Sequence, residues 1–272
     1  MASYKEFKPD PSFDSRIIPS FASSDPRYFE LAIILKIALL QVNPPRGRNR
    51  FSVRDSTDLM RPALRWDRAA WLQFQKDFVQ AVVSTWDQAF LLIAPARYDG
   101  FKFPEKDGTR RDVICGLRLL LVDRAADAHA VLRVVRVAKP TAYFHADSTL
   151  LASTATEPTT HGDTSLGYRW QQHPVAHEVG HLLGLHHSGN ASVACRNGDA
   201  LQCYGSNLPE KVNVMGSGDQ LSRDNARPWR ERIAWHTGVS ADQWTVEWAS
   251  TGAMLHGTES LQRIPNPSLI DI

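Results

Sequence analysis

Residues 177–187, with the sequence HEVGHLLGLHH, constrain this chain more than any other segment, because they place four histidines and a glutamate within eleven residues. Pro174 precedes them and favours the first turn of a helix. The pattern predicts a helix from Pro174 to about Leu183, ended by Gly184. On such a helix, side chains four residues apart lie on one face. Any fold of this chain must therefore place that histidine-bearing face where its imidazoles can act together.

The spacing of the histidines is that of a metal site. His177 and His181 lie four residues apart, so both imidazoles can reach one zinc ion at about 2.0–2.1 Å. Gly184 lets the chain leave the helix in a left-handed turn, which brings His187 back as the third ligand. Glu178 is rotated around the helix, where it can reach a water beside the metal. Three protein ligands with one open position are typical of a catalytic zinc site.

An exposed helix with solvated histidines is the alternative interpretation of this segment. The three leucines of the segment supply an apolar face, which favours a buried helix instead. His186 directly precedes His187 and makes the third ligand ambiguous, although the spacing from Gly184 favours His187.

The segment resembles the zinc-binding motif HExxHxxGxxH of the metzincin clan of metallopeptidases. Residues 213–217, NVMGS, look like the Met-turn of that clan, with Met215 lying 28 residues after His187. The two motifs cover the C-terminal half of the chain, and residues 1–110 resemble no family. The resemblance implies an α+β catalytic domain. Such a domain has a twisted β-sheet with helices above the active-site cleft, and an irregular Met-turn subdomain with a C-terminal helix below it.

The resemblance also implies an enzyme, a zinc-dependent endopeptidase acting on a protein or peptide substrate. Zinc in such a site lowers the pKa of a water molecule to about 7 and polarises the scissile carbonyl. Glu178 is then the general base and the general acid, and residues 205–222 line the specificity pocket. Two alternatives stay open: a specialised metallopeptidase effector or amidase with a narrow target, and a non-catalytic zinc-containing module that binds peptide. The intact Glu178 argues against the module.

The chain departs from the clan at two features. Ser217 stands where several families of the clan have a tyrosine, so the oxyanion is expected to rely on zinc and on backbone N–H groups. No cysteine precedes Cys115, so the cysteine-switch latency of matrixins is absent. Asp10 or Asp14 is a candidate cap for the zinc instead.

A second metal set is suggested by His145, Asp147 and His161, which look partly like the structural zinc ligands of matrixins. The fourth ligand is missing, because the only candidate, His173, is expected in the wall of the active site. We therefore expect these residues to be polar loop residues near the cleft. Asp163 alone does not make a calcium site.

Composition excludes several classes of protein. The 272 residues are 43% hydrophobic and 22% charged, which is ordinary for a globular protein. The 31 basic and 29 acidic residues are mixed along the chain, so no nucleic-acid partner is expected. The longest apolar stretch, residues 31–40, is about half of what a membrane span needs. Because the N-terminus lacks a signal-peptide pattern, we expect a cytoplasmic protein or export without a Sec signal. The oligomeric state is left open.

The predicted elements follow the order of an α+β domain behind an N-terminal extension. Residues 1–45 are the extension, a possible pro-segment or added helix, and residues 46–272 are the catalytic domain; the proline- and arginine-rich residues 43–50 are interpreted as a linker. The predicted elements are a helix over 27–42, a helix over 67–85 capped by Asp67, strands over 113–122, 131–137 and, more weakly, 143–151, a loop over 153–164, an irregular segment over 188–219, and a helix over 228–237 ended by Gly238.

The three cysteines leave at least one thiol unpaired. Cys195 and Cys203 are close enough to form a disulfide in an oxidising compartment, but the sequence does not decide whether they do. Cys115 lies in an apolar run and is expected to be buried.

Overall fold

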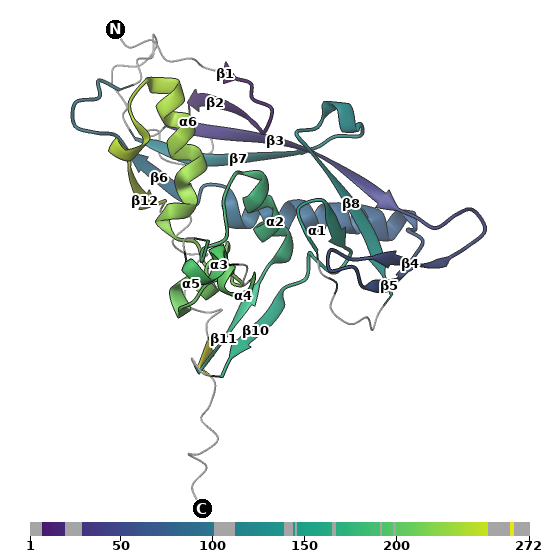
Figure 1. Ribbon diagram of the computed structural model, residues 1–272. Helices are drawn as coiled ribbons and strands as arrows, with labels where there is room; N and C mark the ends of the chain where they lie inside the picture. The colour runs from purple at the N-terminus through teal and green to yellow at the C-terminus, as the bar shows by residue number, and fades with distance from the viewer. Residues whose placement is uncertain are drawn as a thin grey trace, which may run out of the picture. The chain divides into compact units, whose positions relative to one another are not determined.

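A computed structural model describes residues 7–19, 29–100, 112–138, 144, 146–164, 167–190, 192–197, 200–249 and 262–263 (Figure 1). Strands and helices both contribute, so the expected α+β class is confirmed. The described residues form two compact units. The first unit draws on the ranges 1–41, 82–134 and 222–255, and the second unit on 42–81, 135–221 and 256–272. The domain boundary expected after residue 45 stays a prediction.

The first unit is built on a sheet. Its strands are β1 (Phe7–Lys8), β2 (Asp14–Pro19), most of β3 (Phe29–Val42), β6 (Phe90–Ile93), β7 (Val113–Leu121), the first part of β8 (Ala130–Val137) and β12 (Thr245–Trp248). Strands β12, β6, β7 and β3 follow one another, and β2 pairs with both β1 and β3. The other elements are α6 (Arg227–Thr237) and the 3-10 turns η1 (Ala125–Asp127), η2 (Arg223–Ala226) and η3 (Ala241–Gln243).

The helix predicted over residues 27–42 is wrong, because the chain there forms the strand β3. Both Ile33 and Ile37 are fully buried. Strand β3 runs parallel to β7, with Ile33 opposite Leu117 and Ile37 opposite Leu121, which confirms the strand predicted over 113–122. A strand buried on both faces is apolar throughout, so its sequence lacks the alternation that separates a strand from a buried helix.

Tryptophans anchor α6 within the first unit. Trp229 is fully buried, and its ring centroid lies 6.4 Å from that of Trp86. The indole N–H of Trp229 donates a hydrogen bond of 2.9 Å to the carbonyl of Gly116. Gly238 follows the helix in a left-handed conformation, with φ of 74°. The predicted helix over 228–237 and its glycine stop are therefore confirmed.

The second unit contains the histidine segment. Its elements are α1 (Arg68–Trp86) without its last turn, β4 (Arg50–Arg54), β5 (Met60–Leu64), the end of β8, β9 (Leu150–Ala152), β10 (Thr159–Asp163), β11 (Tyr168–Gln172), β13 (Gln262–Arg263), α2 (Pro174–Leu182), α3 (Val193–Arg196), α4 (Ala200–Cys203) and α5 (Leu208–Val212). Strand β5 pairs with β4 and β8, and β11 pairs with β10 and β13. The predicted helix over 67–85 and the strand over 131–137 are confirmed. Asp67 caps α1 by accepting a 2.8 Å hydrogen bond from the Ala70 N–H.

Three predictions for this unit need correction in detail. The loop predicted over 153–164 contains β10, whose polar sequence TTHGD shows no apolar alternation and is held by its pairing with β11. The strand predicted over 143–151 is reduced, among the described residues, to β9 and an isolated bridge. The irregular segment over 188–219 contains the short helices α3, α4 and α5. Residues 43–49 are irregular as predicted, and the guanidinium of Arg65 donates hydrogen bonds to their carbonyls.

A cluster of buried apolar side chains joins β5, the end of β8 and β9: Ala63, Val135, Val137, Phe144, Leu150 and Ala152. The Ser153 N–H donates a 2.7 Å hydrogen bond to the Val135 carbonyl, which holds the end of β9 beside β8. Helix α1 is 19 residues long, but no helix in the described part of the chain is long and apolar enough to cross a membrane.

Candidate metal centre

Helix α2 and the turn that follows it position the histidines. Pro174 occupies the first turn of α2, and the helix ends at Leu182. Gly184 has a φ of 88°, a left-handed backbone conformation that residues with a Cβ rarely adopt. The Leu185 N–H donates a 3.0 Å hydrogen bond back to the Gly180 carbonyl. The glycine thus turns the chain back along the helix, as predicted, and delivers His187 to the two histidines of α2.

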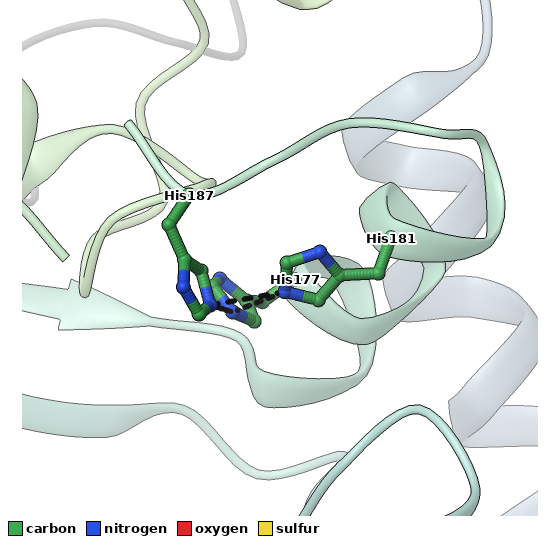
Figure 2. Close-up of side chains that lie close together, drawn as sticks. All are labelled: His177, His181 and His187. Carbon is green, nitrogen blue, oxygen red and sulfur yellow. Dashed lines mark hydrogen bonds between the residues drawn. The ribbon is translucent and has the colours of Figure 1, made fainter. Parts of the chain in front are cut away.

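The three imidazoles converge through their Nε2 atoms (Figure 2). The distances between these atoms are 3.2 Å for His177 and His181, 3.3 Å for His177 and His187, and 3.1 Å for His181 and His187. Tetrahedral zinc with Zn–N bonds of about 2.0–2.1 Å needs nitrogens about 3.3 Å apart. Among the described residues, these histidines are the one group of three or more histidine, cysteine or acidic side chains that could hold a metal ion.

Hydrogen bonds to backbone carbonyls fix the tautomers of two of these rings. His177 Nδ1 lies 2.7 Å from the Val214 carbonyl oxygen, and His181 Nδ1 lies 2.9 Å from that of Leu185. A carbonyl only accepts, so each Nδ1 must carry a proton, and each neutral ring then has a bare lone pair on Nε2. Two lone pairs 3.2 Å apart repel each other unless a cation lies between them. This arrangement is the one that metal-binding histidines adopt.

Burial keeps the three rings neutral. Burial, and after it the neighbouring histidine rings, lower the pKa of His177 to about 3 and that of His187 to about 4. The pKa of His181 is also lowered, again chiefly by burial. All three imidazoles therefore offer lone pairs at neutral pH, which is the protonation state that a metal ligand requires.

Glu178 borders a cavity of about 410 Å³ that opens beside the imidazoles. The cavity is lined by Ala146, Asp147, Ser148, Glu178, His181, Gly184, Leu185, His186, His187 and Tyr204. Burial, and after it the carboxylate of Asp147, raise the pKa of Glu178 to about 7. A carboxylate with that pKa can accept and return a proton near neutral pH.

Met215 lies in a tight turn directly beside the histidines. Its side chain is 1% exposed, and the Gly216 N–H closes the turn with a 2.8 Å hydrogen bond to the Asn213 carbonyl. The Met215 carbonyl accepts a 2.9 Å hydrogen bond from the N–H of Ser188, the residue after His187. The turn is therefore tied to the ligand segment through its backbone. A position of the methionine sulfur beneath the imidazoles stays a prediction.

Ser217 has hydrogen-bond partners other than the three histidines, and His186 stands outside their group. The indole N–H of Trp170 donates to the Ser217 carbonyl at 3.0 Å, and the Ser217 hydroxyl donates to the Lys211 carbonyl at 3.2 Å. His186 is exposed and lines the cavity, but it does not belong to the metal-binding group. The geometry therefore favours His187 as the third member, as its spacing from Gly184 predicted.

The aspartates expected as zinc caps have other partners within the first unit. Asp14 forms an ion pair of 2.7 Å with Lys36, and Asp10 forms one of 3.1 Å with Arg232. These contacts give no support to a capping role.

The second metal set is not assembled by the described residues. His145 lies outside them. The Asp147 carboxylate accepts hydrogen bonds from the N–H groups of the turn that follows it, and His161 Nε2 lies 2.9 Å from the Gln172 side-chain oxygen. Asp163 forms an ion pair with Lys211 at 2.6 Å. Asp147 is therefore a polar residue of a turn, as expected, whereas His161 lies on β10 and not in a loop.

Tyr204 is a residue of the site that sequence reasoning missed. Its ring centroid lies 4.3 Å from that of His187 and 5.7 Å from that of His177. It directly follows Cys203, which forms a disulfide with Cys195, so the pairing left open by the sequence is made. Cys115 is buried, as expected. The sequence feature that could have pointed to Tyr204 is its position immediately after Cys203, at the end of the short loop between the two cysteines.

Comparison with known proteins gave no match for this chain among family models, curated proteins or solved structures.

Proposed function

We propose that this protein is a zinc-dependent endopeptidase. The observation that carries the proposal is the convergence of three neutral Nε2 atoms, 3.1–3.3 Å apart, beside a buried glutamate at a cavity. The resemblance of residues 177–187 and 213–217 to the metzincin motif and Met-turn supports the same proposal. Under it, the chain has a metzincin-like catalytic domain, with the Met-turn subdomain below the cleft.

His177, His181 and His187 would hold the metal. The donor set suits zinc, because three imidazole nitrogens with one position left open are a common arrangement of catalytic zinc. The Val214 and Leu185 carbonyls would orient two of the rings through their Nδ1–H groups. When bound, zinc supplies Lewis acidity that activates a water molecule and polarises a carbonyl.

Glu178 performs the proton transfers. As a carboxylate it takes a proton from the water whose oxygen attacks the peptide carbonyl carbon. A new C–O bond forms, and the C–N bond breaks when Glu178 returns that proton to the leaving amine. A pKa of about 7 allows both steps at neutral pH, because neither the protonated nor the ionised form is too stable.

The test compares wild type with Glu178→Gln at matched zinc content. Glutamine has the same shape but cannot accept the proton, so cleavage of an unfolded protein should fall about 10²–10⁴-fold while zinc stays bound. Glu157→Gln is a suitable control, because Glu157 is exposed and does not line the cavity. Equal, chelator-sensitive rates for wild type and Glu178→Gln would remove the catalytic role. Zinc binding without cleavage of unfolded proteins by wild type would favour a narrow-target enzyme or a peptide-binding module.

A further inference from the structure

His187 is oriented differently from the other two histidines. The rings of His177 and His181 are each fixed by a carbonyl at Nδ1. In the part of the chain that the structure describes, no hydrogen bond to Nδ1 of His187 is seen. Its ring instead lies against the Tyr204 ring, with 4.3 Å between centroids and 34° between planes. An aromatic contact thus takes the place that a hydrogen bond has in the other two.

The loop that carries Tyr204 is closed covalently. The Cys195–Cys203 disulfide joins α3 to the end of α4, eight residues along the chain. Tyr204 is the next residue, so the position of its backbone follows directly from that closure. A disulfide restricts the conformations open to the loop it closes. Helices α3 and α4 have four residues each, which is too short for either to be stable by itself, so the disulfide contributes to holding them in place.

The same loop is also joined to the backbone that leaves His187. The Gly189 N–H donates a 2.9 Å hydrogen bond to the Cys203 carbonyl. The approach is close, because a Cβ at Gly189 would collide with the Gln202 carbonyl oxygen. The disulfide loop is therefore linked to the third ligand in two ways: through Gly189, two residues after His187, and through the ring of Tyr204, the residue after Cys203.

We propose that Tyr204, held by the disulfide-closed loop 195–203, is a positioning residue that orients His187 for metal binding, so that metal affinity depends on the disulfide. This inference rests on the proposed metal site. Changes to groups that orient a metal ligand typically weaken metal binding by about 10–100-fold. The contact that is seen between Tyr204 and His187 is one between their rings.

The first experiment measures the zinc dissociation constant by competition with a chelator, for wild type, Tyr204→Phe, Tyr204→Leu and Tyr204→Ala. Phenylalanine keeps the ring and should bind zinc within about twofold of wild type, whereas leucine and alanine should bind about 10–100-fold more weakly. The visible spectrum of the cobalt-loaded protein should change for leucine and alanine and stay unchanged for phenylalanine. Leu201→Ala, in the same loop but 81% exposed, is the matched control and should bind normally.

The second experiment removes the disulfide by the double substitution Cys195→Ser/Cys203→Ser. Substitution is used because a thiol reductant would itself bind zinc. Zinc affinity should fall about tenfold or more. Adding Tyr204→Ala to this variant should then reduce the zinc affinity much less than it does in wild type, because each change removes the same constraint on the His187 ring.

The two proposals fail in different ways. A wild-type protein that binds no zinc would overturn the metal site itself. A wild type that binds zinc, with Tyr204→Leu or Tyr204→Ala within twofold of it, would overturn only the role of Tyr204, as would an equal loss in Tyr204→Phe. Normal zinc affinity in the double serine variant would overturn the role of the disulfide.

Discussion

Two histidines of this protein, His177 in the second unit and His236 in the first, are both 3% exposed but have different surroundings. His236 Nε2 lies 2.9 Å from the hydroxyl of Ser15, a group that can donate or accept. His177 Nε2 lies 3.2–3.3 Å from two other imidazole nitrogens. The first pair is complete within the chain, whereas the second arrangement is suited to a cation held between the nitrogens.

Burial therefore does not distinguish the two histidines. The group that faces Nε2 does, a hydroxyl for His236 and two imidazoles for His177. Because the Val214 carbonyl fixes the proton of His177 on Nδ1, its Nε2 is left as an acceptor facing the equally bare Nε2 of His181. The comparison predicts different consequences when each histidine, or its partner, is changed.

The largest expected effect is on metal content. His177→Ala should reduce zinc from one ion per chain to none under mild dialysis, because two imidazoles alone form a much weaker site. Elemental analysis of the purified protein measures this directly. The neighbouring exposed histidine provides the contrast, because His186→Ala should keep one zinc per chain. Loss of zinc from His186→Ala together with retention in His187→Ala would reverse the assignment of the third ligand.

A smaller effect is expected where the histidine has a complete partner. Ser15→Ala leaves the buried Nε2 of His236 without the hydroxyl 2.9 Å away, and should lower the free energy of unfolding by about 1–3 kcal/mol. Denaturant titration measures this loss, and zinc content should not change. A loss of zinc in Ser15→Ala would show that this pair is not independent of the metal centre.

The last expected effect is no larger at pH 7 and disappears in acid. It concerns a buried acid that is paired with a cation of the chain itself. Asp55 is 5% exposed and forms an ion pair of 2.8 Å with Arg61. Burial opposes its ionisation, but hydrogen bonds from Arg61, Thr57 and Leu59 outweigh burial and hold its pKa well below the usual range. Its contribution to stability is therefore complete above about pH 4 and is lost as the pH falls further.

Asp55→Asn removes that contribution. The variant should be less stable than wild type by about 1–3 kcal/mol at pH 7, and the difference should shrink as the pH falls below about 4. Thermal unfolding of both proteins at pH 7, 5 and 3 measures the trend. A difference that grows towards low pH would contradict the assigned direction of the pKa.

The sequence by itself determined the parts of the site that depend on local geometry. A four-residue spacing on a helix brings His177 and His181 together whatever the rest of the fold is. Gly184 ends that helix because it adopts a positive φ without strain, and the same reasoning located Gly238 after α6. Short-range rules suffice here because the interacting atoms are few residues apart.

Only the tertiary structure decided the features that join distant segments. Strand β3 was indistinguishable from a helix until β7 lay beside it, since an apolar run fits both. The Val214 carbonyl that orients His177 is 37 residues away from it, and the Tyr204 ring that covers His187 is set by a disulfide that the sequence left open. Periodicity and spacing report only on neighbours along the chain. Contacts across tens of residues depend on how the segments between them pack, and no local pattern records that.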